Sequence, residues 1–273
     1  MHATRPDFFI HCGDTIYADG PIEASVTEPD GQVWRNLVIP EVSDVAQTLA
    51  EFRGRHRYNH LDDNLCAMYA DVPVIAQWDD HETTNNWYPG EVLEDPRYDR
   101  ERRVDVLARY AKRAWWEWQP ISNGQDRRDG QRIHRRVSRG RHLDVFCLDM
   151  RTFKDPNTPG LEQRRTSLIG DEQVRWLARE LKRSTATWKV ISADLPLGIV
   201  VPDGLEGEDS VFELMQADDQ TVIDTIGGYQ DGFTWLADDR FISIAQVHSH
   251  AIGAGFQRAV AAQAEVGQHR GVD

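Results

Sequence analysis

Residues 74–82 read Val74-Ile75-Ala76-Gln77-Trp78-Asp79-Asp80-His81-Glu82, an apolar run that ends in four consecutive ionisable side chains. The apolar part is typical of a β-strand that is buried on both faces. Four ionisable side chains at the end of such a strand are costly to gather unless a cation or a substrate compensates their charge. The alternative interpretation is an exposed acidic turn.

Other predicted strands end in the same way, in a polar residue that can bind a metal ion. The predicted strands and the residues that follow or close them are 8–12 with Asp14, 143–148 with Asp149, 187–192 with Asp194, and 241–245 with His248. A further strand is predicted at 133–137. Helices are predicted at 41–69, at 99–118 and from 171 onward, where apolar residues recur every three or four positions. This alternation indicates an α/β fold, and we expect the strand ends to meet in one crevice.

Size and charge exclude several classes of protein. The chain has 273 residues, 40% of them hydrophobic, so we expect a globular protein and a single domain over residues 1–273. Its formal net charge of −14 argues against a nucleic-acid scaffold or an anionic membrane as partner, because both favour a basic surface. The apolar runs are too short to span a bilayer.

The candidate residues have alternative interpretations when each is taken alone. Asp14 follows Gly13 and can bridge two cations through its two carboxylate oxygens, but an Asp after a strand also forms turns and caps helices. His81, beside an acidic pair, is suited to donate a proton to a leaving oxygen. His248 and His250 are two residues apart and would point to opposite sides of an extended segment, so a shared metal ion requires a turn.

The histidines outside these motifs, among them His56 and His134, lie in polar surroundings and are expected at the surface. We therefore give them no role in a site.

Several motifs follow one another in a recognisable order. They are Gly13-Asp14-x-x-Tyr17, the Trp78 to Glu82 run with Asn85-Asn86 after it, Leu148-Asp149-x-Arg151, Gln173-x-x-Trp176-Leu177, and Trp188-Lys189-Val190-Ile191. Over about residues 6–200 this order resembles the PhoD-like (alkaline phosphatase D) metallophosphatases, relatives of the purple acid phosphatases. The resemblance implies a metallophosphoesterase-like α/β/β/α sandwich, which we expect to be incomplete in this chain.

The resemblance also implies hydrolysis of phosphate mono- or diesters by a hydroxide bound at a dinuclear metal centre. Asp14 corresponds to the carboxylate that bridges the metal ions, and Tyr17 to a phenolate ligand of a ferric ion. Asp80 corresponds to a further ligand. Asp194 stands where the purple phosphatases have a histidine ligand, and His248 corresponds to the closing histidine. Fe and Ca are the metal ions suggested by the family, with Zn or Mn as alternatives.

Two residues are expected to act on the substrate, a small phosphate ester. His81 corresponds to the catalytic histidine, and Arg151 is placed to clamp a phosphate oxygen. For Arg151 an ion pair with a local carboxylate is an equally good interpretation. The oligomeric state stays open, and so does the compartment, because family members are commonly exported while this chain shows no signal segment.

This sequence departs from the family pattern near both ends. The aspartate motif that normally lies upstream of Gly13 has no room in the chain, and Gln246 replaces an acid that would help to hold the second metal ion. We therefore expect a member that is truncated at the N-terminus and divergent at the C-terminus. The alternative functions are a catalytically impaired remnant and a cation-binding module without catalysis. His81 argues against the module, which has no need of a histidine in its acidic cluster.

Overall fold

The computed structural model describes residues 1–119, 121, 132–156, 167 and 169–194, together with the backbone of 202–203, 211–212 and 241–245. The chain divides into two compact units, Met1–Gln131 and Arg132–Asp273. The prediction of one domain over residues 1–273 stays a prediction. His248 and Gln246 lie outside the described residues.

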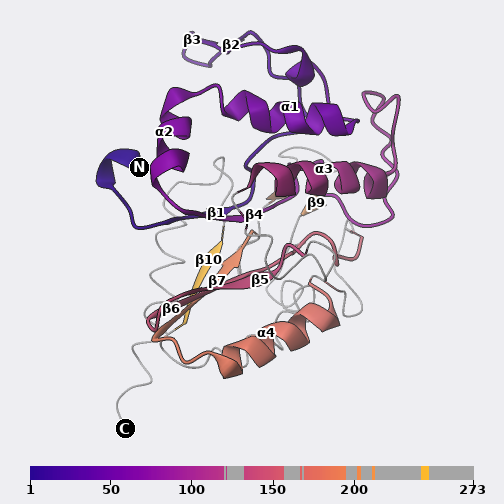
Figure 1. Cartoon of the computed structure of the whole chain (residues 1–273). Coiled ribbons are helices and arrows are strands. Elements are labelled where there is room, and N and C mark those ends of the chain that lie inside the picture. Colours follow the sequence, from indigo (N-terminus) through magenta and orange to yellow (C-terminus); the bar gives the residue numbers. More distant parts are fainter. Residues whose placement is uncertain are drawn as a thin grey trace. The chain divides into compact units, whose positions relative to one another are not determined.

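A pair of parallel strands organises the first unit (Figure 1). β1 (Phe9–Cys12) pairs with β4 (Val74–Gln77), and the register runs from Phe9 opposite Val74 to Cys12 opposite Gln77. Every residue of β4 is buried, Gln77 included, as the mostly apolar run predicts. Both strands are confirmed. Because they run parallel, their carboxyl ends and the loops that follow lie next to each other.

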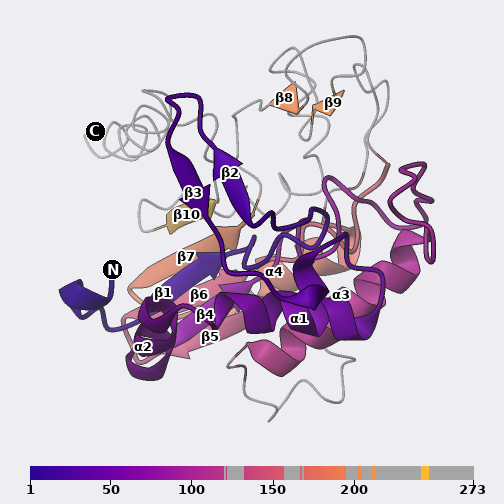
Figure 2. The same cartoon turned by 90° about the horizontal axis from the view of Figure 1, so that it is seen from above.

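The predicted helix over 41–69 is wrong as one continuous element. It breaks into a 3₁₀ turn (Pro40–Val42), α1 (Leu49–Asn59) and α2 (Asp63–Asp71). Polar side chains start the two helices: Thr48 forms a capping box with Glu51, and the Asp62 carboxylate accepts a hydrogen bond from the Leu65 N–H at 2.8 Å. A 3₁₀ turn at His2–Thr4 opens the chain, and an antiparallel ribbon of β2 (Ser25–Thr27) and β3 (Val33–Arg35) precedes the helices (Figure 2).

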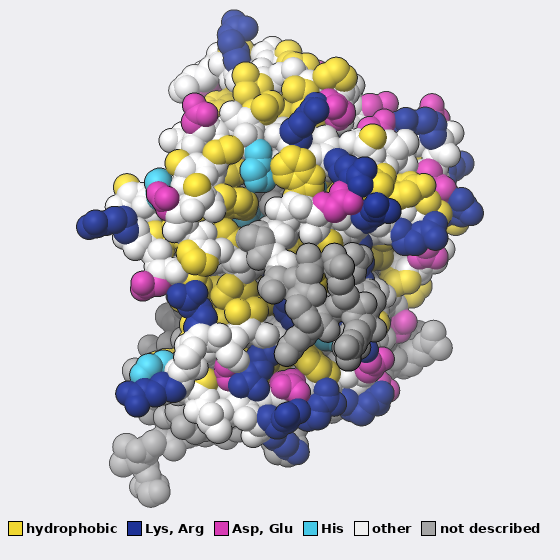
Figure 3. Space-filling model, viewed as in Figure 1, with side chains coloured by type: hydrophobic (Ala, Val, Ile, Leu, Met, Phe, Trp, Pro, Cys, Tyr) yellow, Lys and Arg dark blue, Asp and Glu magenta, His cyan; other side chains and the backbone are white. Residues whose placement is uncertain are grey.

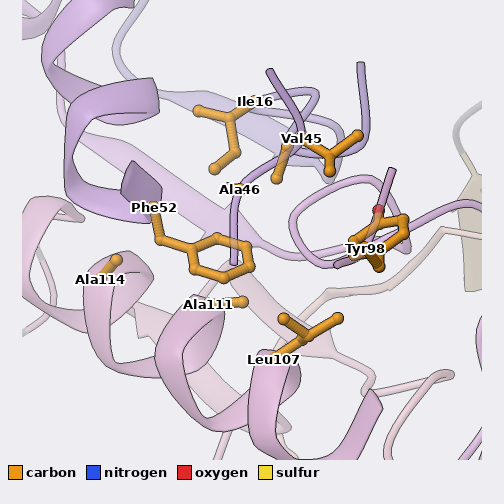
Figure 4. Close-up of a cluster of buried hydrophobic side chains, with 9 residues drawn as sticks. Ile16, Val45, Ala46, Phe52, Tyr98, Leu107, Ala111 and Ala114 are labelled. Atoms are coloured by element: carbon orange, nitrogen blue, oxygen red, sulfur yellow. The ribbon is translucent and has the colours of Figure 1, made fainter. Parts of the chain in front are cut away.

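The core of the first unit forms between α1 and α3 (Val104–Trp118). Figure 4 shows its side chains, of which Phe52 projects from α1 toward Leu107 and Ala111 of α3. The predicted apolar stripe of α3 is confirmed at its buried positions, which are Val104, Leu107, Ala111 and Ala114. Ile16 belongs to the same cluster, so the loop that follows β1 is packed into the core.

The expectation that His56 and His134 lie at the surface is wrong. His56 is only 1% exposed and His134 only 5%. The His56 ring stacks on Trp118 of α3, with 6.2 Å between the ring centroids. Burial, together with the nearby His60, lowers the pKa of His56 to about 3, so this ring is packed as a neutral group.

The second unit contains a four-stranded sheet with the order β10-β7-β6-β5. β6 (Leu143–Cys147), β7 (Trp188–Ala193) and β10 (Phe241–Ala245) run parallel, and β5 (Arg135–Arg139) is antiparallel to β6. α4 (Asp171–Arg183) buries Val174, Leu177 and Leu181, the stripe expected of an amphipathic helix. A short antiparallel pair, β8 (Pro202–Asp203) and β9 (Val211–Phe212), completes the elements.

Helices and parallel strands occur in both units, which confirms the predicted α/β class. Among the described residues, no helix combines the length and the apolar character needed to cross a membrane.

Candidate metal centre

The loops that follow β1 and β4 approach each other closely at Gly13. Its backbone has φ +108°, in the region that favours glycine. A Cβ atom at this position would lie 2.4 Å from the Cβ atom of Asp79, which is far too close for two carbon atoms. The next residue, Asp14, also has a positive φ of 54°. The glycine therefore lets the two acidic loops come together, as the Gly13-Asp14 motif predicts.

Glu82 ties the two loops together. Its carboxylate accepts backbone N–H hydrogen bonds from Asp14 at 3.2 Å and Thr15 at 2.6 Å on one loop, and from Asp79 at 2.7 Å on the other. Burial and the charge of Asp14 raise the pKa of Glu82 to about 8, although the backbone hydrogen bonds lower it. The sequence marks Glu82 as one of the clustered acids, but its positioning role follows only from these contacts.

Asp14, Asp80 and His81 form a group that can hold a metal ion. One ligand atom from each residue lies within 4.8 Å of the others. Asp80 is fully buried, and its carboxylate accepts the backbone N–H groups of His81 at 2.9 Å and Asn86 at 2.5 Å. A carboxylate has about four lone-pair positions, so these two hydrogen bonds orient Asp80 and leave it able to coordinate.

The electrostatics of the group favour a cation. Burial, followed by the charges of Asp79 and Asp80, raises the pKa of Asp14 to about 7, while His81 lowers it. A positive ion among these carboxylates would relieve their mutual repulsion. Carboxylate oxygens with an imidazole suit Fe, Zn and Mn, and an all-oxygen subset suits Ca. The residues present therefore fit a bound metal ion, and a second ion stays a prediction.

Tyr17 lies directly against this group. Its hydroxyl donates a hydrogen bond to Oδ2 of Asp14 at 2.8 Å, and its ring stacks on His81 with 4.2 Å between the centroids. Burial and the charge of Asp14 raise the pKa of the Tyr17 hydroxyl. The phenol oxygen is thus next to the carboxylate that is predicted to bridge the metal ions, and its role as a ligand stays a prediction.

Asp19 is a site residue that the sequence analysis missed. Its Oδ2 lies 2.7 Å from Nδ1 of His81 and also accepts the Asn85 N–H at 2.8 Å. Burial alone would lower the pKa of His81, but the hydrogen bond to Asp19 and the charges of Asp80, Asp19 and Asp14 raise it to about 10. The sequence offered a faint signal, an acid two residues after Tyr17. Its pairing with a histidine 62 positions away is a tertiary contact.

Hydrogen bonds hold Asp19 and the residues on either side of it in place. Arg97 Nη1 donates to the Asp19 backbone carbonyl at 3.1 Å, and the buried Arg55 donates to the Gly20 carbonyl at 2.6 Å and to the Asp44 carbonyl. The preceding residue, Ala18, donates its N–H to the carbonyl of His81 at 2.8 Å. These contacts fix the segment that carries Asp19 to the segment that carries His81.

In the second unit, the loops after β6 and β7 bring Arg151 and Asp194 together. Both side chains are fully buried, and Arg151 Nε lies 3.2 Å from Oδ2 of Asp194. The neighbouring Asp149 accepts the N–H groups of Arg151 at 3.3 Å and Thr152 at 3.0 Å through Oδ1. This pair matches the alternative interpretation of Arg151 as the partner of a local carboxylate. Its role in binding a phosphate stays a prediction.

Comparison with known proteins places this geometry in a family. The family of PhoD-like phosphatases matches residues 1–248. The chain belongs to the PhoD-like phosphatase family. It is 31% identical over 210 residues to alkaline phosphatase D of Bacillus subtilis (strain 168), an alignment that covers 71% of this chain and 33% of that protein.

A solved structure shares the fold. The structure described as "Structure of PhoD" superposes with a TM-score of 0.60 and 24% identity, over 89% of this chain and 46% of that chain. The chain thus spans about one third of the alkaline phosphatase D sequence and about half of the solved PhoD structure.

In this PhoD-like chain the predicted site residues fall into three sets. Asp14, Tyr17, Asp80 and His81 are brought together in the first unit. Arg151 and Asp194 meet in the second unit. His248 lies outside the described residues. The family resemblance is confirmed, and the individual roles of these residues stay predictions.

Proposed function

We propose that this chain is a metal-dependent phosphoesterase that hydrolyses phosphate mono- or diesters at a dinuclear metal centre. The observation that supports the proposal is the partly buried group of Asp14, Asp80 and His81, in which two carboxylates and an imidazole converge at the ends of two parallel strands. The family to which the chain belongs is a phosphatase family, which favours this reaction over cation storage.

The ligands proposed in the first unit are Asp14, Tyr17 and Asp80. When bound, the metal ions supply a water molecule of lowered pKa and positive charge opposite the phosphoryl oxygens. Glu82 holds the loops that carry Asp14 and Asp79 at a fixed separation through its backbone hydrogen bonds. Preorganisation of this kind is what a metal site requires from the residues around its ligands.

His81 is proposed to donate a proton to the leaving oxygen of the ester. Asp19 accepts a hydrogen bond from Nδ1 and so fixes the ring, which assigns the transfer to Nε2. The ring of Tyr17 stacks on the ring of His81 and restricts how the imidazole can rotate. His81 is therefore proposed as a proton donor whose orientation Asp19 fixes.

Arg151, Asp194 and His248 complete the proposal. Asp194 and His248 are proposed as ligands of the second metal ion, and Arg151 as the group that binds a phosphate oxygen. The ion pair between Arg151 and Asp194 is compatible with this assignment, because a carboxylate can accept from a guanidinium and still coordinate through its other oxygen.

Metal analysis and an activity assay on the same sample test the proposal. We expect about two metal ions per chain, among Fe, Ca, Zn and Mn, and hydrolysis of aryl phosphate mono- or diesters that chelation abolishes. Asp80→Ala is expected to abolish turnover and to lower the metal content, because loss of a ligand should exceed the roughly 10–100-fold effect of losing a second-shell partner.

Glu94→Ala is the matched control, because Glu94 is an exposed carboxylate of the same unit. It should keep both metal content and activity. A folded wild-type chain with little bound metal and no turnover would favour the alternative, a catalytically impaired member of the family. Unchanged activity of the Asp80→Ala variant would overturn the proposed site.

A further inference from the structure

The first unit contains a cavity of about 580 Å³ between the β2–β3 ribbon and the junction of α1 and α2. Its walls include two aromatic rings and several polar side chains, namely Trp34, Arg35, Tyr58, Asn59, Asp62 and Asn64. Cavities of a few hundred Å³ are the size at which proteins bind small organic groups. The mechanism described above makes no use of it.

Trp34 of β3 is an exposed ring that is nevertheless held in place. It is 65% exposed, while its indole N–H donates to Oδ1 of Asn36 at 2.7 Å. The amide of Asn36 donates in turn to the Glu23 carbonyl at 2.7 Å. Hydrophobic side chains are visible on the surface at this end of the unit (Figure 3). A ring whose orientation is already fixed loses little freedom when a ligand stacks on it, which favours binding.

A hydrogen bond links the lining of the cavity to the loop of the candidate metal centre. Asn59, one of its lining residues, donates a side-chain hydrogen bond to the carbonyl of Thr15. Thr15 lies in the loop between Asp14 and Tyr17, and its own N–H is bound by Glu82. A side chain that lines the cavity therefore contacts the loop that carries two of the proposed metal ligands.

The charges around the cavity select the kind of group that it accepts. Arg35 contributes one positive charge, and Asp62 and Asp63 contribute two carboxylates. This balance disfavours a second phosphate group. The exposed face of Trp34 and the partly buried Tyr58 favour a flat ring instead, because aromatic rings stack with a defined geometry.

We propose that this cavity binds the aromatic ring of an ester substrate, so that the enzyme prefers aryl or heteroaryl phosphate esters to alkyl esters. The inference rests on the proposed phosphoesterase function and adds a specificity residue, Trp34. Trp34 contacts the organic group of the substrate and takes no part in bond cleavage.

The first test compares phenyl phosphate with butyl phosphate, following the release of inorganic phosphate. Trp34→Ala should lower kcat/KM for phenyl phosphate by about tenfold, mainly through KM, and leave butyl phosphate nearly unchanged. Taking the ratio of variant to wild type for each ester removes the difference in their intrinsic reactivity. Trp34→Phe should retain most of the preference, because it keeps an aromatic face.

Trp188→Ala is the matched control, because Trp188 is a 47% exposed tryptophan of the second unit and is not part of the cavity. It should leave both esters as in the wild type. An equal effect of Trp34→Ala on both esters, or no effect on either, would overturn the inference while the phosphoesterase proposal stands.

A binding experiment separates the two proposals if the chain hydrolyses neither ester. Calorimetry with phenylphosphonate and butylphosphonate, which cannot be hydrolysed as esters, measures occupation of the cavity without turnover. We expect phenylphosphonate to bind the wild type several-fold more tightly than butylphosphonate, and Trp34→Ala to remove the difference. Equal affinities for the two ligands in the wild type would overturn the inference whatever the activity of the chain.

Discussion

The two units place acidic residues at the same kind of position and treat their charge in different ways. In the first unit, the ends of β1 and β4 carry a group of carboxylates and the imidazole of His81. In the second unit, the ends of β6 and β7 carry Asp149 and Asp194, with the buried guanidinium of Arg151 between them in the chain. Burial and neighbouring acids raise the pKa of Asp14 to about 7.

An acidic residue at the end of a strand therefore does not define a metal site by itself. A carboxylate that pairs with a buried guanidinium already has a positive charge beside it. Removing either partner would leave the other charge buried in a region of low dielectric constant, which destabilises the fold. Carboxylates that lie close together repel one another and gain from a nearby cation. We therefore expect the Arg151–Asp194 pair to contribute more to the stability of the fold than the Asp14 group does, whatever further role either group has, and this expectation can be tested.

The largest stability effect is expected at the pair in the second unit. Arg151→Ala should lower the free energy of unfolding by about 3–5 kcal/mol, because it leaves the buried Asp194 carboxylate without its partner. Urea denaturation measures the effect. Replacing both partners, as Arg151→Met with Asp194→Leu, should recover much of the loss.

Arg53→Ala is the control for this change, since the Arg53–Glu117 pair is partly exposed and should contribute no measurable stability. If Arg151→Ala unfolds at the same urea concentration as the wild type, the buried Arg151–Asp194 pair does not stabilise the fold. The difference that we expect between the two units is then wrong.

A buried histidine without a carboxylate partner gives a second, pH-dependent test. His56 has a pKa of about 3 in the folded chain against 6.5 for an ordinary histidine. The unfolded chain therefore binds the extra proton first, so the stability that His56 contributes is present above pH 6.5 and is lost as the pH falls toward 3. His56→Phe, which keeps a ring against Trp118, should reduce this loss by a few kcal/mol.

The measurement is urea denaturation of both proteins between pH 7 and the acid limit of reversible folding. Two curves of stability against pH with the same slope would contradict the neutral, buried state of His56. A smaller slope in the variant would sharpen the contrast with His81, whose pKa is raised by its carboxylate neighbours although it too is mostly buried.

The smallest effect is expected at Asp19, which acts on the site through His81. Asp19→Asn keeps the shape of the side chain and weakens its hold on Nδ1 of His81, so kcat should fall by about tenfold with little change in KM. Steady-state kinetics on an aryl phosphate measure both constants, and metal content should stay that of the wild type. A large loss of bound metal would instead make Asp19 part of the metal centre.

Much of the fold follows from local patterns. The strands β1, β4, β6 and β7 were predicted because mostly apolar runs are typical of buried parallel strands. The helices α3 and α4 were predicted because apolar residues recur at helical spacing. The pattern failed over residues 41–69, where two capping side chains, Thr48 and Asp62, begin separate helices. Apolar spacing continues across such a break, so periodicity alone does not reveal it.

The candidate site was partly predictable for the same reason. Asp14, Asp80 and His81 follow strands, and a parallel pair brings its carboxyl ends together whatever the length of chain between them. The burial of His56 and His134 was not predictable from their polar sequence neighbours, because aromatic rings that are distant in sequence, Trp118 and Trp176, pack against them.

The sequence by itself determined the family, the α/β class and the residue types gathered at the strand ends, because these depend on short runs of neighbouring residues and their order. Which charged groups meet was decided only by the tertiary structure. Arg151 meets Asp194, 43 residues away, and Asp19 meets His81, 62 residues away. Coulomb interactions depend on distance in space and on the loss of water around each charge, and neither quantity is written in the spacing of residues along the chain.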